Sequence, residues 1–498
     1  MARPELVGCR RGRQRYLAAR SCAKLERGSS LLIGHIMASS RATQAIQIPA
    51  KGALPPGPKG LPLFGVALSL RGDVLGVLTR IARQYGDIAH VPLLMQSRIL
   101  VSSPEWIEDL IVRQPQKFDK GPGLKDASRR LLGEGLLTSE GELWRRQRRL
   151  AQPAFHRQRI GEYAQVMVEQ AAAHTRDWRD GETRDMAEEM MALTLIIAVK
   201  TLFGIEFTDE AKRVGPAVTL LMRYQLGRLR SPIKIPMHWP TPSNLRAERA
   251  YEFLDSLVYG IIEERRRRRD AGEPEGRDVL SLLMNAMDED GSHMTPKQLR
   301  DEVMTLFIAG HETTAVTLGW LWHLLAQNPR VEQRLAEELR SVLAGRAPTP
   351  EDLPRLPYLD AVIKEVLRLY PAAYVLQRTS LEPFDLAGYH FPVNTTAIMS
   401  QWILHRDPRY FDAPEEFRPE RWLDGLENRL HPYSYFPFGG GPRRCIGQIF
   451  ALMEAALVAA TLAQKFHFTE REGMKVVPEP LVTLRAKGGV PMSVKTRD

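Results

Sequence analysis

Ten residues, Phe438 to Gly447, constrain this chain more than any other stretch of its sequence, and they read Phe-Gly-Gly-Gly-Pro-Arg-Arg-Cys-Ile-Gly. Three consecutive glycines let the backbone turn sharply and approach a flat partner closely, and Pro442 stiffens the exit from the turn. An apolar run follows at residues 449–462 and predicts a buried helix. The pattern therefore places Cys445 at the start of a helix, where unpaired N–H groups favour a thiolate over a thiol.

A thiolate held in this way can ligate haem iron and favour O–O cleavage. Arg443 can pair with a haem propionate through charge-assisted hydrogen bonds. The alternative is a buried free cysteine after a glycine-rich turn, which is the commoner role of a single cysteine. The stretch resembles the cysteine signature of the cytochrome P-450 superfamily at Phe438, Gly441, Arg443, Cys445 and Gly447, and this resemblance favours the haem ligand.

A second match lies in an apolar segment, residues 304–325, whose polar centre indicates a long core helix rather than a membrane span. Its Ala309-Gly310-His311-Glu312-Thr313-Thr314 run is similar to the family's oxygen-binding segment. Ala309 and Gly310 would leave room for haem and dioxygen. Thr313 would hydrogen-bond the reacting oxygen, and Glu312 would supply protons through waters. Helical spacing places five residues on one face: Ala309, Gly310, Thr313, Thr314 and Thr317. For Thr313 alone, a hydrogen bond to a carbonyl one turn earlier is an equally good explanation.

A structural network is predicted from two further segments. Glu365 and Arg368 are three residues apart on a predicted helix that ends at Pro371, so they can form a partly buried ion pair. The resemblance implies Arg421 as a third member, which would support the segment that presents Cys445.

Other matches concern cofactor binding. Trp144 and Arg148 resemble the family's Trp-x-x-x-Arg pattern, in which both side chains reach one haem propionate, although a plain basic amphipathic helix would show the same spacing. Arg378 is a further propionate candidate, and Phe438 belongs to the cysteine loop. Spacing separates Arg145 and Arg149 from Arg148, and we expect them to be free to bind a partner protein.

The matches run in family order over about residues 50–498. The resemblance therefore implies one mainly helical domain with a small β region, in which haem b lies between the oxygen-binding helix and the helix after Cys445. It implies a monooxygenase that inserts one atom of dioxygen into a C–H bond of a hydrophobic small molecule. About 50 residues follow Cys445, so electrons are expected from a separate ferredoxin, or from a flavodoxin or reductase. Alternatives are a related peroxygenase or isomerase, against which Glu312 and Thr313 argue, and a non-enzymatic haem protein that binds a ligand.

The number of cysteines and the distribution of charge indicate where in the cell the protein is expected and what its N-terminal segment is. Only Cys9, Cys22 and Cys445 occur, too few for a disulfide framework, which favours a cytoplasmic protein. Of the formal charge of +10, much lies in residues 1–36, with eight basic and two acidic residues. That composition resembles a transit peptide, but we expect residues 1–49 to be a basic, disordered tail or a misassigned start. We expect a monomer with no membrane anchor and no nucleic-acid partner.

Local patterns predict several elements. A helix is expected at residues 74–85, strands at 88–94 and 98–101, and a helix opened by Ser103 and Pro104. Residues 143–371 are expected to be almost entirely helical, followed by strands at 395–399 and 466–468 and a hairpin at 482–494. By family analogy, the substrate pocket would be lined by five segments: 117–136, 218–237, 309–317, 374–376 and 481–484.

Overall fold

The computed structural model describes residues 53–93, 96, 98–204, 213–230, 235–273, 276, 278–288, 290–471 and 473–497. The chain divides into two units between Gln47 and Ile48. The first unit lies outside the described residues, so the disordered tail expected at residues 1–49 stays a prediction. The described residues all belong to the second unit, which extends from Ile48 to Asp498.

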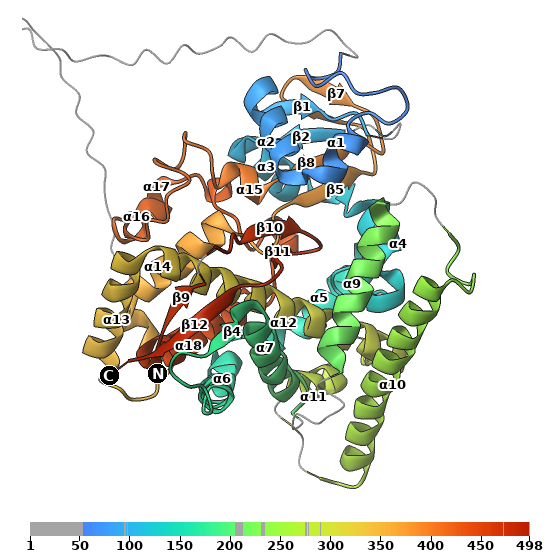
Figure 1. The fold of residues 1–498 in the computed structure, drawn as a ribbon. Helices are drawn as coiled ribbons and strands as arrows, with labels where there is room; N and C mark the ends of the chain where they lie inside the picture. The colour runs from blue at the N-terminus through green and yellow to red at the C-terminus, as the bar shows by residue number, and fades with distance from the viewer. Residues whose placement is uncertain are drawn as a thin grey trace, which may run out of the picture. The chain divides into compact units, whose positions relative to one another are not determined.

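Helices make up most of the second unit, and α12 (Pro296–Gln327) passes through the middle of its helical part (Figure 1). This helix begins with a capping box made by Thr295 and Gln298, with Pro296 at its first position. It packs along α7 (Met186–Phe203). The other described helices are α1 (Ala67–Gly72), α2 (Val74–Tyr85), α3 (Pro104–Glu108), α4 (Gly121–Leu132), α5 (Gly141–Ala151), α6 (Arg157–His174), α9 (Val214–Arg230), α10 (Pro242–Asp270), α11 (Val279–Asn285), α13 (Pro329–Leu343), α14 (Pro357–Leu369), α15 (Gln401–Leu404), α16 (Glu420–Leu423), α17 (Leu426–Arg429) and α18 (Gln448–Lys465).

The strands form four small sheets among the described residues. The largest has the order β1-β2-β8-β5-β3, and its one parallel pair is β2 with β8. A second sheet has the order β4-β12-β9, and the hairpins β6-β7 and β10-β11 complete the set. Their bounds are β1 (Ile88–His90), β2 (Arg98–Val101), β3 (Phe118–Asp119), β4 (Thr183–Asp185), β5 (Leu376–Ser380), β6 (Phe384–Leu386), β7 (Tyr389–Phe391), β8 (Thr396–Met399), β9 (Phe466–Glu470), β10 (Val477–Pro480), β11 (Leu484–Lys487) and β12 (Pro491–Thr496).

The mainly helical fold class is confirmed, and several local predictions are accurate. The helix predicted at residues 74–85 is α2, which ends before Gly86 at a φ of 85°. The hairpin predicted at residues 482–494 is wrong. Its two strands belong to different sheets: β11 pairs with β10, whereas β12 pairs with β9 and β4. Local alternation of apolar residues does not reveal pairing with strands that are distant in the sequence.

One large hydrophobic cluster includes residues of α6, α7, α12, α14 and α18. Trp320 and Trp322, both on α12, are among its largest fully buried side chains. In the described part of the chain, no helix combines the length and the apolar character needed to cross a membrane. The core of the second unit therefore surrounds the helix that carries the predicted oxygen-binding segment.

Candidate active site

A short opening interrupts the burial of α12. Between Leu299 and Leu325, only Ala309, Gly310 and Thr313 are not buried. These three residues share one side of the helix, since they are separated by one, three and four positions. A Cβ atom added to Gly310 would meet nothing within 4 Å. Unfilled space therefore borders the middle of a core helix at the predicted oxygen-binding segment.

The threonines of this segment make hydrogen bonds along the helix. The Thr313 hydroxyl donates to the Ala309 carbonyl at 2.8 Å, and the Thr314 hydroxyl donates to the Gly310 carbonyl at 3.2 Å. Thr314 and Thr317 are buried, so only part of the predicted five-residue face borders the opening. Thr313 thus makes the back-bond that the sequence allowed as an alternative, while its side chain keeps access to the open space.

The cysteine loop has a backbone that requires glycine. Gly441 has a φ of 62°, and a Cβ atom there would lie 1.9 Å from the carbonyl oxygen of Ile111. The loop is closed by the backbone N–H of Cys445, which donates to the carbonyl of Phe438 at 3.0 Å. α18 begins at Gln448. The helix therefore begins three residues after Cys445, whereas the sequence predicted Cys445 at its start.

The Cys445 side chain has exposed surface although much of its surroundings is protein, as expected at the wall of a cavity. Burial raises the pKa of the Cys445 thiol. The backbone N–H of Gly447 and the charges of Arg148 and Arg444 act in the opposite direction and only reduce that shift. The peptide by itself thus favours the neutral thiol, and a metal cation at the sulfur would favour the thiolate.

Four cationic side chains gather near the cysteine loop. The pKa of Lys120 is well below its usual value because the amine is buried and because the charges of Arg443, Arg378 and Arg148 lie nearby, while Glu302 offsets part of this effect. Lys120 donates to the carbonyl of Leu136 at 3.4 Å. Glu140 pairs with Arg443, and a bound anion would compensate the remaining positive charge. The two propionates of a haem fit this requirement.

The three predicted cations of this cluster have protein contacts of their own. Arg148 donates to the carbonyl of Arg444 at 2.7 Å, which ties α5 to the cysteine loop. The Arg443 guanidinium lies 3.8 Å from the centre of the Trp144 ring and forms an ion pair with Glu140. Arg378 donates to the carbonyl of Gln377 at 2.8 Å. Lys120 was not singled out from the sequence, because a lone lysine before a helix carries no specific signal.

The predicted network around Glu365 is assembled in full. Glu365 and Arg368 are both 0% exposed and make two hydrogen bonds, at 2.9 and 2.8 Å. Arg421 donates to Glu365 at 2.9 Å, and the indole of Trp422 donates to it at 2.8 Å. Arg368 also donates to backbone carbonyls of three residues: His405, Pro414 and Glu416. Trp422 is a member that the sequence did not suggest.

Arg145 and Arg149, which we expected to be available to a partner protein, each form an ion pair within the chain, and binding of a partner there stays a prediction. Arg149 and Arg146 both pair with Asp288, at 2.6 and 2.7 Å. Arg145 pairs with Glu142, its neighbour on α5. The sequence could not show the first of these contacts, because Asp288 follows α11 and is distant from α5 in the chain.

Two buried carboxyl groups near the site were also missed. Burial raises the pKa of Glu302 on α12 and of Glu454 on α18, each to about 8. A hydrogen bond with Thr314 opposes part of the shift at Glu454, so this carboxyl lies close to the predicted oxygen-binding segment. Burial therefore favours the neutral form of both carboxyl groups.

A pH dependence of stability follows from Glu454. Between pH 4.5 and 8, the unfolded chain loses this proton whereas the folded chain keeps it, so the free energy of unfolding falls as pH rises through this window. Glu454 should lower the free energy of unfolding of the parent by on the order of 3 kcal/mol between pH 5 and pH 8, and we expect Glu454→Gln to abolish this decrease. Urea unfolding at the two pH values measures it. Glu351→Gln, at an exposed position, is the control and should keep the parent's pH dependence, and equal slopes in all three proteins would refute the assignment.

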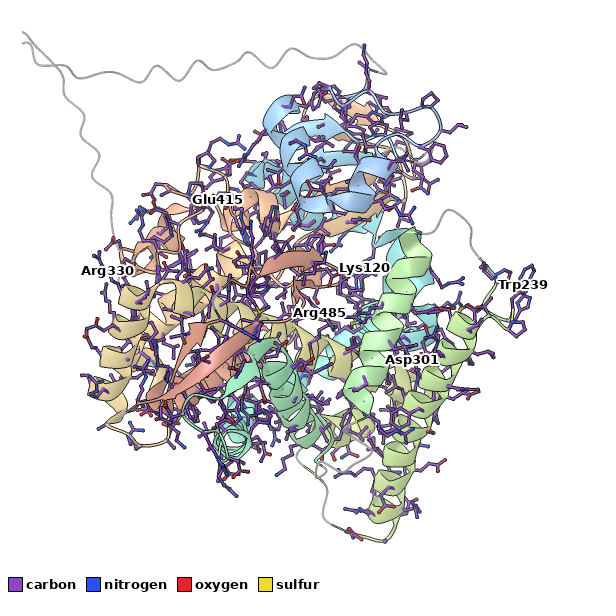
Figure 2. The ribbon with its side chains drawn as sticks, viewed as in Figure 1. Lys120, Trp239, Asp301, Arg330, Glu415 and Arg485 are labelled. Atoms are coloured by element: carbon purple, nitrogen blue, oxygen red, sulfur yellow. The ribbon has the colours of Figure 1, made fainter. Side chains whose placement is uncertain are left out.

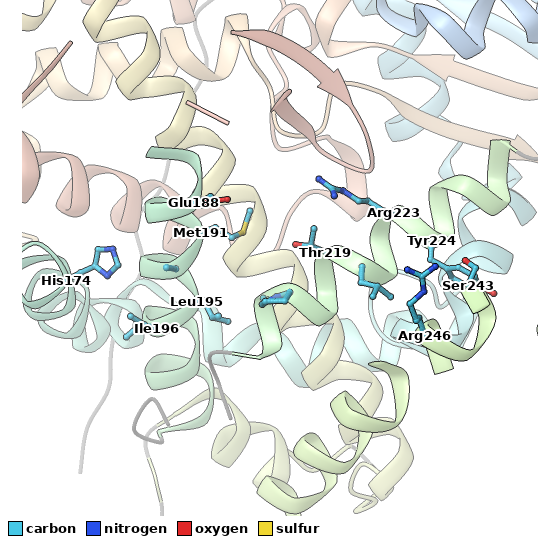
Figure 3. A pocket seen from close by; sticks show the side chains of 14 residues that line it. His174, Glu188, Met191, Leu195, Ile196, Thr219, Arg223, Tyr224, Ser243 and Arg246 are labelled. Carbon is cyan, nitrogen blue, oxygen red and sulfur yellow. The ribbon is translucent and has the colours of Figure 1, made fainter. Parts of the chain in front are cut away.

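A cavity of about 1030 Å³ lies between α7, α9 and α10 (Figure 3). Its walls include apolar side chains such as Met191, Leu195 and Leu220, with Arg223 among the polar residues. None of its lining residues belongs to α12 or to the cysteine loop. This cavity is therefore separate from the opening at Gly310.

Three features of the site are typical of a haem-thiolate protein. They are a thiol on a glycine-rich loop, a cluster of cationic side chains suited to two carboxylates, and an opening beside a core helix. Comparison with known proteins agrees. The family model for cytochrome P450 matches residues 55–490. Cyclooctat-9-en-7-ol 5-monooxygenase of Streptomyces melanosporofaciens is 37% identical, over 84% of this chain and 92% of the relative.

Two other relatives widen the comparison. Pentalenene oxygenase of Streptomyces avermitilis is 33% identical, over 86% of this chain and 94% of the relative. Human cytochrome P450 4V2 is 30% identical, over 89% and 90% of the two chains. The chain belongs to the cytochrome P450 family. It is a haem-iron monooxygenase of a hydrophobic small molecule, and the sequence-based prediction of family and reaction class is confirmed.

Proposed function

We propose that this enzyme hydroxylates a C–H bond of a terpene. The names of two relatives, cyclooctat-9-en-7-ol 5-monooxygenase and pentalenene oxygenase, support this substrate class. The observation that carries the proposal is the opening at Ala309, Gly310 and Thr313 in an otherwise buried α12. Two of these three residues have no polar side-chain atom, so the opening suits a bulky apolar substrate held by shape rather than by hydrogen bonds.

We further propose that the cofactor is haem b, with Cys445 as the ligand of its iron. Arg148, Arg378, Arg443 and Lys120 would hold the propionates, with Trp144 carrying the Arg443 guanidinium on its ring. Phe438 would border the same cofactor from the loop that closes onto Cys445. When bound, the haem iron supplies the activation of dioxygen for insertion into the C–H bond.

The residues of α12 supply space and protons in this proposal. Gly310 leaves room beside the helix, because a side chain there would enter the opening. The Thr313 hydroxyl, which now donates to Ala309, can rotate and donate its proton toward the reacting oxygen. Glu312 would pass protons to Thr313 through waters, using the carboxylate oxygen that has no partner among the described residues.

The proposal is tested with the haem-loaded enzyme, a panel of cyclic terpenes, ¹⁸O₂ and NAD(P)H delivered through a surrogate ferredoxin and its reductase. We expect one ¹⁸O atom in the product. Thr313→Ala should lower product formed per NAD(P)H at least fivefold while haem content stays unchanged. Thr317→Ala, at a buried threonine one helical turn after Thr313, is the matched control and should form as much product per NAD(P)H as the parent. Product without ¹⁸O, or full coupling in Thr313→Ala, would contradict the proposal.

We propose that an acidic ferredoxin or flavodoxin delivers the electrons at α5. A cavity of about 360 Å³ on this helix is lined by seven residues: Trp144, Arg145, Arg148, Arg149, Gln152, Pro153 and His156. The Arg148 contact with the carbonyl of Arg444 connects its wall to the cysteine loop. Arg145 and Arg149 are 58% and 53% exposed, so their ion pairs are screened by water and leave both cations accessible to a partner.

We expect Arg145→Glu to slow reduction by an acidic ferredoxin at least fivefold, because it reverses a charge on the proposed docking surface. Stopped-flow measurements of the reduction rate at rising ionic strength test this. The parent should be reduced faster than Arg145→Glu at low salt, and this difference should decrease as the salt concentration increases. Arg266→Glu, at a partly exposed position of α10 that none of these contacts involves, is the control. Identical, salt-independent rates in the three proteins would place docking elsewhere. A cytoplasmic monomer stays a prediction.

A further inference from the structure

Glu312 is held by a strand that is distant from it in the sequence. Its Oε1 atom accepts hydrogen bonds from the Thr483 hydroxyl at 2.7 Å and from Nε of Arg485 at 2.9 Å, and Nη2 of Arg485 forms an ion pair with it at 2.7 Å. Figure 2 labels Arg485 on β11. The side chain of Glu312 is 1% exposed, and its other oxygen, Oε2, has no partner among the described residues. One carboxylate oxygen is therefore fully engaged and the other is unengaged.

The strand that carries these donors is fixed to α12. The indole N–H of Trp320 donates to the carbonyl of Leu484 at 2.7 Å, and the N–H of Leu484 donates to the carbonyl of Ala372 at 3.0 Å. Thr483 and Arg485 flank Leu484 and are two positions apart, so both side chains leave the chain on the same side, toward Glu312. The anchoring of Leu484 thus sets the position of both donors.

Arg485 also contacts helix α9. Its Nη2 atom lies 3.7 Å from the sulfur of Met222, a buried residue of α9. His311, beside Glu312, is no second cation, because burial lowers the pKa of its ring to about 4. Among the described residues, Arg485 is thus the cation in contact with Glu312. A carboxylate this far from water is stable only with such a partner.

We propose that Arg485 is a positioning residue for proton supply in the monooxygenase reaction. It holds Glu312 by Oε1 in one arrangement and leaves Oε2 as the atom that exchanges a proton with water. The inference deepens the proposed function, because it rests on the role of Glu312 in passing protons to Thr313. Arg485 itself donates no proton to the reacting oxygen in this scheme and acts only through Glu312.

The test is a double-mutant cycle in the haem-loaded enzyme. We expect Arg485→Ala to lower the rate of product formation at least tenfold, and Arg485→Lys to recover at least a third of the parent rate. In a Glu312→Gln background, Arg485→Ala should cause no further loss, because the group through which Arg485 acts is already absent. Lys487→Ala, at an exposed position of the same strand, is the matched control and should behave like the parent.

A second measurement does not depend on turnover. Infrared spectra of Arg485→Ala should show a protonated-carboxyl band that disappears in Arg485→Ala/Glu312→Gln, since a buried carboxyl without its cation takes up a proton. The parent should lack this additional band, and absorption from other protonated carboxyls, such as Glu302 and Glu454, should be the same in all samples. Carbon-monoxide difference spectra of the same samples report whether the haem site is intact, so loss of the fold is recognised separately.

Each outcome decides one point. Equal rate losses from Arg485→Ala in the parent and Glu312→Gln backgrounds would show that Arg485 only stabilises the strand, and the inference would be wrong. An active Glu312→Gln enzyme would overturn the proposed role of Glu312 itself. An unchanged infrared spectrum in Arg485→Ala would show that Arg485 does not hold the carboxylate. Three results together would support the inference. Arg485→Ala lowers the rate of product formation, Arg485→Lys recovers it, and Arg485→Ala causes no further decrease in the Glu312→Gln background.

Discussion

Replacing Cys445 with Ser should yield a protein whose reduced carbonyl complex lacks the red-shifted Soret band of a thiolate-ligated haem. The expected loss is complete, because no other cysteine occurs outside residues 1–36. A hydroxyl in place of the thiol cannot supply the same electron-rich ligand to iron. Product formation should be lost in the same sample. Absorbance difference spectra of the reduced protein with and without carbon monoxide measure the effect.

Cys22→Ser is the matched control for this experiment. It removes a thiol of the same chain from the basic N-terminal segment and should leave the Soret band and the rate unchanged. Cys445→His adds a second test, since an imidazole can bind the iron but gives a spectrum of a different type. Survival of the red-shifted band in either Cys445 variant would refute the ligand assignment.

The largest effect on stability is expected from Glu365→Gln. This change keeps the shape of the side chain but removes the negative charge that Arg368 and Arg421 share, so that Arg368 loses its ion pair and Arg421 keeps only its pair with the exposed Asp412. Breaking a buried ion pair in this way costs about 3–5 kcal/mol. We expect a fall of that size in the free energy of unfolding by urea, together with loss of bound haem on gel filtration.

Glu427→Gln is the control for the network. Glu427 pairs with Lys364 but is 57% exposed, so water screens the pair and its loss should change stability little. If Glu365→Gln unfolds at the same urea concentration as Glu427→Gln and keeps its haem, the network has no supporting role. If it loses stability but binds haem normally, the role is confined to the fold.

Elements with local signals were predictable from the sequence. α2 ends where Gly86 provides a left-handed residue, and the Glu365–Arg368 pair follows from a spacing of three on a helix. The site itself was only partly predictable. The Glu312–Arg485 pair, the Arg149–Asp288 pair and the approach of Lys120 to Arg378 and Arg443 join residues that are far apart in the chain. No periodicity or short motif encodes such contacts, because they arise only when helices and strands pack.

The hairpin prediction at residues 482–494 failed for the same reason, because the partner strands are distant in the sequence. β12 alternates apolar residues as a hairpin strand would, yet it pairs with β9 on one side and with β4 on the other. β4 lies between α6 and α7, in a region that we expected to be almost entirely helical. A strand of three residues has too few positions to show an alternating pattern, so it is recognised only by its partner.

The close contact between Gly441 and Ile111 has a consequence for synthesis of the enzyme. The carbonyl of Ile111 leaves no room for a side chain at Gly441. The conformation of the cysteine loop thus depends on a segment that is synthesised long before it. Contacts between such distant positions form slowly and only after the intervening chain has folded. The ribosome must therefore release nearly the whole polypeptide before the loop can adopt its final shape. With Cys445 of this loop as the proposed iron ligand, haem would be acquired late in maturation, after the loop has formed on Ile111.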